Sequence, residues 1–172
     1  FLANPRLRVS VNVSAIQFVK ENFVSVVQNA LTEQHIDGHN LTLEITESVG
    51  LLATKDIRDK IKTLQSFGVH ISIDDFGTGF SNLSQLNNLS ADCLKIDRSF
   101  VHRLDTSTGE HIVEMIINLG QKLNLHVIAE GVETHEQQQL LLSMGCQEAQ
   151  GYLHAHPLSA EQLHKWIKEK VT

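Results

Sequence analysis

Apolar residues follow two alternating periods along the chain. Six short segments have the composition of buried β-strands, and each is followed by apolar positions at helical spacing. Phe23, Val24, Val27 and Leu31, for example, form one helical face after the first segment. Strict alternation of strand and helix predicts a parallel sheet, either doubly wound or closed into a barrel. The predicted strands are residues 8–13, 41–46, 69–74, 92–97, 126–130 and 148–153.

The helix ends carry their own signals. Gly145 follows a short apolar stripe and predicts a helix stop. Ser159 and Gln162 have capping-box spacing and predict the start of the last helix. We expect that helix to bury Leu163, Trp166 and Ile167.

Polar residues near the strand ends distinguish the two sheet types. In each strand, a polar residue shares a face with a small or neutral residue two positions earlier, as Asn12 does with Ser10. The opposite faces, which include Val9 and Val11, suit packing under helices. Polar groups delivered by every strand to one interior favour a barrel, because a doubly wound sheet gathers its ligands at one switch point. We therefore predict an α/β fold, a TIM-type (β/α) barrel with six of its usual eight strand-helix units visible.

The bulk composition narrows the class of protein. The 172 residues are 41% hydrophobic and 20% charged, with a net charge of -6, which suits a globular domain and argues against a nucleic-acid polymer as partner. No apolar run approaches the roughly twenty residues of a membrane helix, so we expect no membrane contact by this segment. Two widely separated cysteines favour a reducing, cytoplasmic location. The start at Phe1 lacks methionine and leader features, and we expect it to be a cut through a longer protein.

Several carboxylates are predicted to meet at the barrel mouth. They would repel one another in a partly dry pocket unless protons or cations neutralised them, and oxygen ligands favour Mg²⁺ or Mn²⁺ over zinc. Adjacent Asp74 and Asp75 could bridge two ions, the standard arrangement for displacement at phosphorus. The sequence therefore predicts metal-assisted phosphodiester hydrolysis. The residues at the mouth are Glu44, Asp74, Asp75 and Glu130, neutral Asn12 and Gln150, and the cation Lys95.

Each feature also has a simpler interpretation. Residues 74–79 could form an ordinary turn, since Asp and Gly suit turns. A phosphate-binding glycine loop is disfavoured, because Asn82 stands at the third glycine position and two acids precede the loop. Lys95 could form an interior ion pair without catalytic work. His154 and His156 share a face of the last predicted strand, where a surface or hydrogen-bonding role is favoured over metal binding.

Six motifs follow one another along the chain. They are Asn12-Val13-Ser14 with Gln17, Glu44-Ile45-Thr46-Glu47, Asp74-Asp75-Phe76-Gly77-Thr78-Gly79, Leu94-Lys95-Ile96-Asp97, Glu130-Gly131-Val132-Glu133 and Gln150-Gly151-Tyr152. Together the motifs resemble those of the EAL-domain cyclic di-GMP phosphodiesterases over essentially the whole chain. This resemblance implies a barrel with one antiparallel strand, often dimeric, that linearises cyclic di-GMP to pGpG with two Mg²⁺ or Mn²⁺ ions.

The same resemblance implies a role for each residue. Lys95, Glu130 and Gln150 are expected to act in catalysis. Glu47 anchors the loop after Asp75, with Glu133 and Asp97 as further support. The expected metal ligands are Asn12, Glu44, Asp74, Asp75 and Glu130. The loop that is expected to contact the substrate and the dimer partner consists of Phe76, Gly77, Thr78, Gly79 and Phe80.

The chain also departs from the family pattern. The Glu-Ala-Leu signature occurs nowhere, and we expect it upstream of Phe1, which makes residues 1–172 the C-terminal three quarters of an EAL domain. His154 and His156 replace the Phe and Lys that usually follow Gln-Gly-Tyr-Leu. We expect weak or no catalysis from the fragment by itself.

Two rival functions and several partners remain open. A non-catalytic cyclic di-GMP receptor would commonly lack the signature Glu, and an unrelated enolase-like barrel would share only the acidic mouth. Open strand edges at residues 8–13 and 148–153 predict a homodimer or a strand-exchanged assembly. Sensory or GGDEF-type domains are expected in the parent protein, which other domains could anchor to a membrane.

Overall fold

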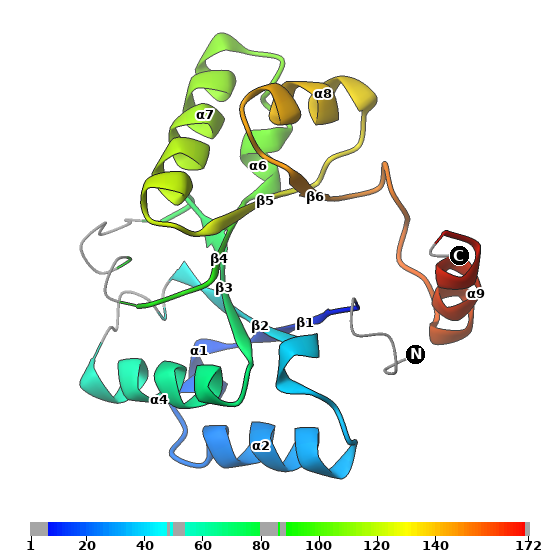
Figure 1. Cartoon of the computed structure of the whole chain (residues 1–172). Coiled ribbons are helices and arrows are strands. Elements are labelled where there is room, and N and C mark those ends of the chain that lie inside the picture. The colour runs from blue at the N-terminus through cyan, green and yellow to red at the C-terminus, as the bar shows by residue number, and fades with distance from the viewer. Residues whose placement is uncertain (1–6, 48, 50–53, 80–85, 87–88, 171–172) are drawn as a thin grey trace.

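A six-stranded parallel sheet forms the centre of the molecule (Figure 1). The computed structural model describes residues 7–47, 49, 54–79, 86 and 89–170. Neighbouring strands follow the chain order, and the sheet curls into a half-barrel with helices outside. The predicted α/β barrel-type fold is confirmed. The strands are β1 Val9–Val13, β2 Leu41–Thr46, β3 His70–Phe76, β4 Cys93–Ile96, β5 His126–Glu130 and β6 Glu148–Gln150.

Side-chain caps fix where the helices begin. The Thr54, Thr106 and Thr134 hydroxyls each accept a hydrogen bond from a backbone N–H three residues later, at the starts of α4, α7 and α8. Gly145, at φ +90°, follows α8 as predicted. The helices are α1 Ala15–Phe18, α2 Phe23–Glu33, η1 Gly38–Asn40, α4 Lys55–Ser66, α6 Arg98–Val101, α7 Ser107–Lys122, α8 His135–Ser143 and α9 Ala160–Lys170.

The main core lies between the outer face of the sheet and these helices. Ile45, Ile71 and Leu94 on the strands are fully buried, as are Ile61 on α4 and Ile117 on α7. Full burial of one such side chain stabilises the fold by about 1.5–3 kcal/mol. Because strand residues alternate between faces, this packing turns the intervening polar residues toward the inside of the curl.

The edge strand β1 departs from the expected packing. Val9 and Val11 were expected to be covered by helices, but they are 42% and 44% exposed. Val13 on the same face is 6% exposed, so the cover reaches only the carboxyl-terminal end of β1.

The C-terminal segment differs most from the prediction. Strand β6 ends at Gln150, so His154 and His156 do not share a strand face, and the ring of His156 instead lies 4.3 Å from that of Tyr152. Helix α9 begins with the predicted hydrogen bonds between Ser159 and Gln162.

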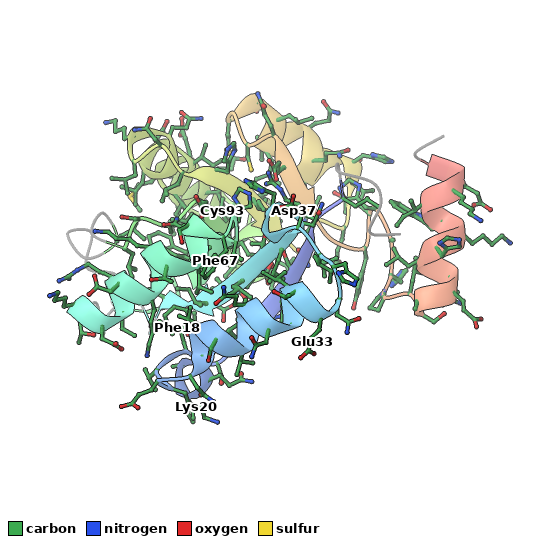
Figure 2. All side chains as sticks on the ribbon, turned by 60° about the horizontal axis from the view of Figure 1, so that its bottom comes forward. Phe18, Lys20, Glu33, Asp37, Phe67 and Cys93 are labelled. Carbon is green, nitrogen blue, oxygen red and sulfur yellow. The ribbon has the colours of Figure 1, made fainter. Side chains whose placement is uncertain are left out.

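The expected burial of the apolar face of α9 is wrong. Leu163 is exposed, and Trp166 and Ile167 are only half-buried. The reason is the position of α9, which stands apart from the helices that cover the sheet in both views (Figures 1 and 2). Within the described part of the chain, no helix combines the length and apolar character needed to cross a bilayer.

Candidate metal centre

Backbone register aligns the predicted site residues along the inner face of the sheet. Asn12 pairs with Glu44 across β1 and β2, and Glu130 pairs with Gln150 across β5 and β6. Asp74 on β3 lies opposite Thr46 on β2. Since parallel strands end at the same edge, all these side chains belong to the carboxyl-terminal end of the sheet.

Lys95 is the centre of a buried ion cluster. Its Nζ lies 2.6 Å from Glu44 Oε2, 2.5 Å from Glu130 Oε1 and 3.2 Å from Asp74 Oδ1. The side chain of Lys95 is 3% exposed, and those of Glu44, Asp74 and Glu130 are 7%, 13% and 17% exposed. The structure thus brings together four predicted residues from four strands. The interior ion pair considered for Lys95 is present, with three carboxylates instead of one.

The cluster shifts the acidity of its members. Burial alone would lower the pKa of Lys95, but hydrogen bonds and charges from Glu130 and Glu44 outweigh burial, and its pKa lies above the ordinary value. The ammonium group therefore stays protonated. Burial raises the pKa of Glu130, and repulsion from Asp74 and Glu44 adds to this rise while Lys95 opposes it.

Asp75 reaches the cluster through an irregularity in β3. Alternation along a regular strand would turn Asp75 away from Asp74. The register between β3 and β4 shifts between Ile73 and Phe76, and Asp75 has φ +55°, a left-handed conformation uncommon for residues other than glycine. Oxygens of Asp74, Asp75 and Glu130 consequently lie within 4.8 Å of one another.

The local environment of Asp75 is unfavourable for its charge. The residue is exposed, yet the surrounding protein desolvates its carboxyl group, which raises the pKa of Asp75 together with repulsion from Asp74 and Asp97. Carboxylates crowded in this way gain most from a bound cation. The oxygen-only donor set of Asp74, Asp75 and Glu130 fits a hard divalent ion.

Glu47 holds the loop after Asp75. Its Oε2 accepts a hydrogen bond from the Gly77 backbone N–H at 3.2 Å. A side chain at Gly79 would begin 3.1 Å from Glu47 Oε1, so glycine permits the close approach. Gly77 has φ +94° and lies against the Phe100 ring. Thr78 donates its hydroxyl hydrogen to the Asp75 carbonyl at 2.9 Å, while Phe80 lies outside the described residues.

A cavity of about 410 Å³ adjoins the carboxylate cluster. Three other predicted residues line it. Asp97 accepts a hydrogen bond from the Ser99 backbone N–H and caps α6. Glu133 lies 3.6 Å from His102 Nε2. Gln150 is exposed on β6. The lining is Asp75, Asp97, Arg98, His102, Glu130, Gly131, Glu133, Gln150, Gly151 and Tyr152.

Two basic residues of this lining were missed by the sequence interpretation. Arg98 and His102 are four residues apart around the short helix α6, so they share one side of it. The spacing was visible in the sequence, directly after Lys95-Ile96-Asp97, but nothing in it showed that α6 borders the cavity. Asn12, by contrast, was predicted as a ligand and is exposed on β1, outside this lining.

Fold and site together define a (β/α) barrel-type protein with a cluster of carboxylates at the carboxyl ends of its strands. A sequence profile of the EAL domain matches residues 2–157. The chain therefore belongs to the EAL domain family, as the motifs indicated.

Individual relatives share this likeness. The chain is 44% identical to the oxygen sensor protein DosP of Escherichia coli over 92% of its own length and 20% of that protein. It is also 44% identical to the bifunctional diguanylate cyclase/cyclic di-GMP phosphodiesterase MucR of Pseudomonas aeruginosa, over 90% of its length and 23% of MucR. The chain thus spans about a fifth to a quarter of these relatives.

Solved structures agree with the fold. The MucR phosphodiesterase in complex with c-di-GMP superposes with a TM-score of 0.82 at 44% identity, over 91% of this chain and 64% of that one. BlrP1 of Klebsiella pneumoniae in complex with manganese and cyclic di-GMP gives a TM-score of 0.79 at 28% identity, over 87% of this chain and 39% of BlrP1.

Proposed function

We propose that the chain is the catalytic part of a metal-dependent phosphodiesterase that hydrolyses cyclic di-GMP to linear pGpG. The observation that carries this proposal is the convergence of Asp74, Asp75 and Glu130 within 4.8 Å, beside the buried ammonium of Lys95. Family membership supports it, as do the names of MucR, a cyclic di-GMP phosphodiesterase, and of the BlrP1 complex.

Asp74, Asp75 and Glu130 would hold two Mg²⁺ or Mn²⁺ ions, with Glu44 and Asn12 completing the ligand set from β2 and β1. When bound, the ions supply an activated water at neutral pH and neutralise charge at the phosphate.

Lys95 positions groups and does not accept protons. With a pKa above its ordinary value, its ammonium remains a donor and cannot serve as the general base. It donates to Glu44 Oε2 at 2.6 Å and fixes that carboxylate, and the same positive charge stabilises negative charge that develops at phosphorus.

Glu130 is shared between the proposed metal site and Lys95. Its Oε1 lies 2.5 Å from Lys95 Nζ, which orients the carboxylate as a ligand for the ions. Gln150, the register partner of Glu130 on β6, would donate a hydrogen bond to the substrate or the water.

The wider protein is also part of the proposal. We place residues 1–172 in an EAL domain of a larger cytoplasmic signalling protein, because DosP and MucR extend far beyond the matched segment. We further propose a homodimer or strand-exchanged assembly, in which the loop from Phe76 to Phe80 links the partner to the site.

The test is an assay of pGpG formation by the full-length product of the gene that encodes this chain. With Mn²⁺ we expect conversion of cyclic di-GMP to pGpG, which chromatography measures. Adding EDTA should prevent formation of the product. Asp74→Asn should abolish turnover, because it removes a carboxylate from the cluster. Asp56→Asn, an equal charge change at an exposed position of α4, should leave the rate unchanged.

Two results would contradict the proposal in different ways. Tight, metal-dependent binding of cyclic di-GMP without any pGpG would favour the receptor interpretation. Absence of both binding and turnover in a folded, metal-loaded protein would remove cyclic di-GMP as the ligand.

A further inference from the structure

The cavity beside the carboxylate cluster has an unbalanced charge. Four acids line it, namely Asp75, Asp97, Glu130 and Glu133, against Arg98 as the one Lys or Arg among its described lining residues. If cyclic di-GMP is the substrate, as proposed above, two phosphates enter this acidic space. Ions at Asp74, Asp75 and Glu130 can neutralise one of them, so the other needs a separate cation.

Arg98 is held beside the site by a glycine. Gly131 directly follows Glu130 and has φ +69°. A Cβ at this position would lie 2.5 Å from Arg98 Cβ and 3.3 Å from His102 Nε2. Only a residue without a side chain lets helix α6 bring its basic side this close to the end of β5.

The charge of Arg98 is also available. Among its acidic neighbours, Asp97 accepts from the backbone N–H and the hydroxyl of Ser99, and Glu133 lies 3.6 Å from His102 Nε2. Asp75 attracts the charge of Arg98 but forms no ion pair with it in the described structure. Arg98 itself is exposed and forms no ion pair with any residue that the structure describes. A guanidinium presents paired N–H donors that match two phosphate oxygens.

We infer that Arg98 is a substrate-binding residue that contacts the phosphate of cyclic di-GMP that the metal ions do not hold. This inference rests on the proposed function and adds to it a contact from α6. His102, one turn away, lies 3.6 Å from Glu133 Oε1.

The experiment measures cyclic di-GMP affinity by calorimetry on the full-length protein saturated with Ca²⁺. Arg98→Gln should weaken binding about tenfold, the effect of losing one charged hydrogen-bonded contact. Arg98→Lys should recover part of this loss, because it restores the charge without the fork. Arg103→Gln is the matched control, with the same charge change five residues later and outside the cavity lining. It should bind as the wild type does.

Mn²⁺ affinity without nucleotide separates this role from an effect on the metals. It should stay within about twofold of wild type in Arg98→Gln, and the melting temperature should confirm folding. The inference is overturned if Arg98→Gln binds cyclic di-GMP normally, if Arg103→Gln loses as much affinity, or if the loss follows a loss of Mn²⁺. A wild-type protein that binds Mn²⁺ but no cyclic di-GMP would instead defeat the proposed function, and this inference with it.

Discussion

Replacing Lys95 with methionine tests the electrostatic logic of the site most directly. The substitution keeps an unbranched side chain, one atom shorter, but removes the ammonium that contacts Glu44, Asp74 and Glu130, whose side chains are at most 17% exposed. Breaking a buried ion pair from one side typically costs about 3–5 kcal/mol. For a chain of this size, such a loss corresponds to a fall in melting temperature of roughly 6–20 °C.

The assay is thermal unfolding of the chain in EDTA, compared with Lys60→Met as a matched control. Lys60 is also buried, but its carboxylate partner Asp56 is 68% exposed, so we expect a smaller loss of about 1.5–3 kcal/mol, mainly for its bond to the Val19 carbonyl. Lys95→Met should regain stability with Mn²⁺, because the ions replace the missing positive charge. Lys60→Met should show no greater response to metal than the wild type.

The pH response of Lys95→Met has a definite sign. Glu130 already has a raised pKa, and removing Lys95 raises it further. A carboxyl group with a raised folded-state pKa adds stability below its unfolded pKa, near 4.3, and loses it as pH rises through the folded value. The difference between variant and wild type should therefore shrink on mild acidification. If Lys95→Met had the same melting temperature as the wild type in EDTA at neutral pH, the argument that Lys95 offsets repulsion among the buried carboxylates would be refuted.

Three further outcomes follow from the structure. Mn²⁺ at a hundredfold excess over its Kd should stabilise the wild type by about 2.7 kcal/mol and so raise its melting temperature. Asp74→Ala should remove most of this rise in calorimetric scans. Burial and the charge of Arg8 lower the pKa of His70. As the pH falls, this histidine therefore binds its proton in the unfolded chain before it does so in the folded protein. Stability should then fall as pH drops below about 6.5, and His70→Asn should flatten that slope in urea titrations. Gly131→Ala should destabilise the fold by about 1–3 kcal/mol, through its positive φ and the 2.5 Å approach to Arg98, whereas a normal urea midpoint would contradict the close packing.

The sequence was sufficient for the regular part of the fold. Period-two segments such as Leu41–Thr46 became strands at the predicted bounds, because their apolar face is buried under helices. The same alternation placed Glu44 and Glu130 on the inner face, where Lys95 joins them. These residues are positioned by backbone register, which a sequence pattern encodes directly.

The remainder depends on interactions that no local pattern contains. Alternation alone would have turned Asp75 outward, and only the register shift between β3 and β4 with a left-handed residue brings it to the cluster. Arg98 borders the cavity because Gly131 permits close packing between distant segments. The burial of Trp166 was overestimated because an apolar stripe on α9 reveals no partner surface. The metal ligand roles, the domain limits and the dimer loop stay predictions.

The order of the strands gives the centre and the rim of the site unequal stiffness. Strands β2 to β5 are each clamped by hydrogen bonds on both sides, whereas β1 and β6 have a single neighbour within the described chain. Within the described chain, Glu44 and Lys95 therefore stand on strands that are paired on both sides, while Asn12 and Gln150 stand on strands paired on one side. When residues 1–172 are studied by themselves, the amide hydrogens of β1 and β6 should exchange with solvent before those of β2 to β5.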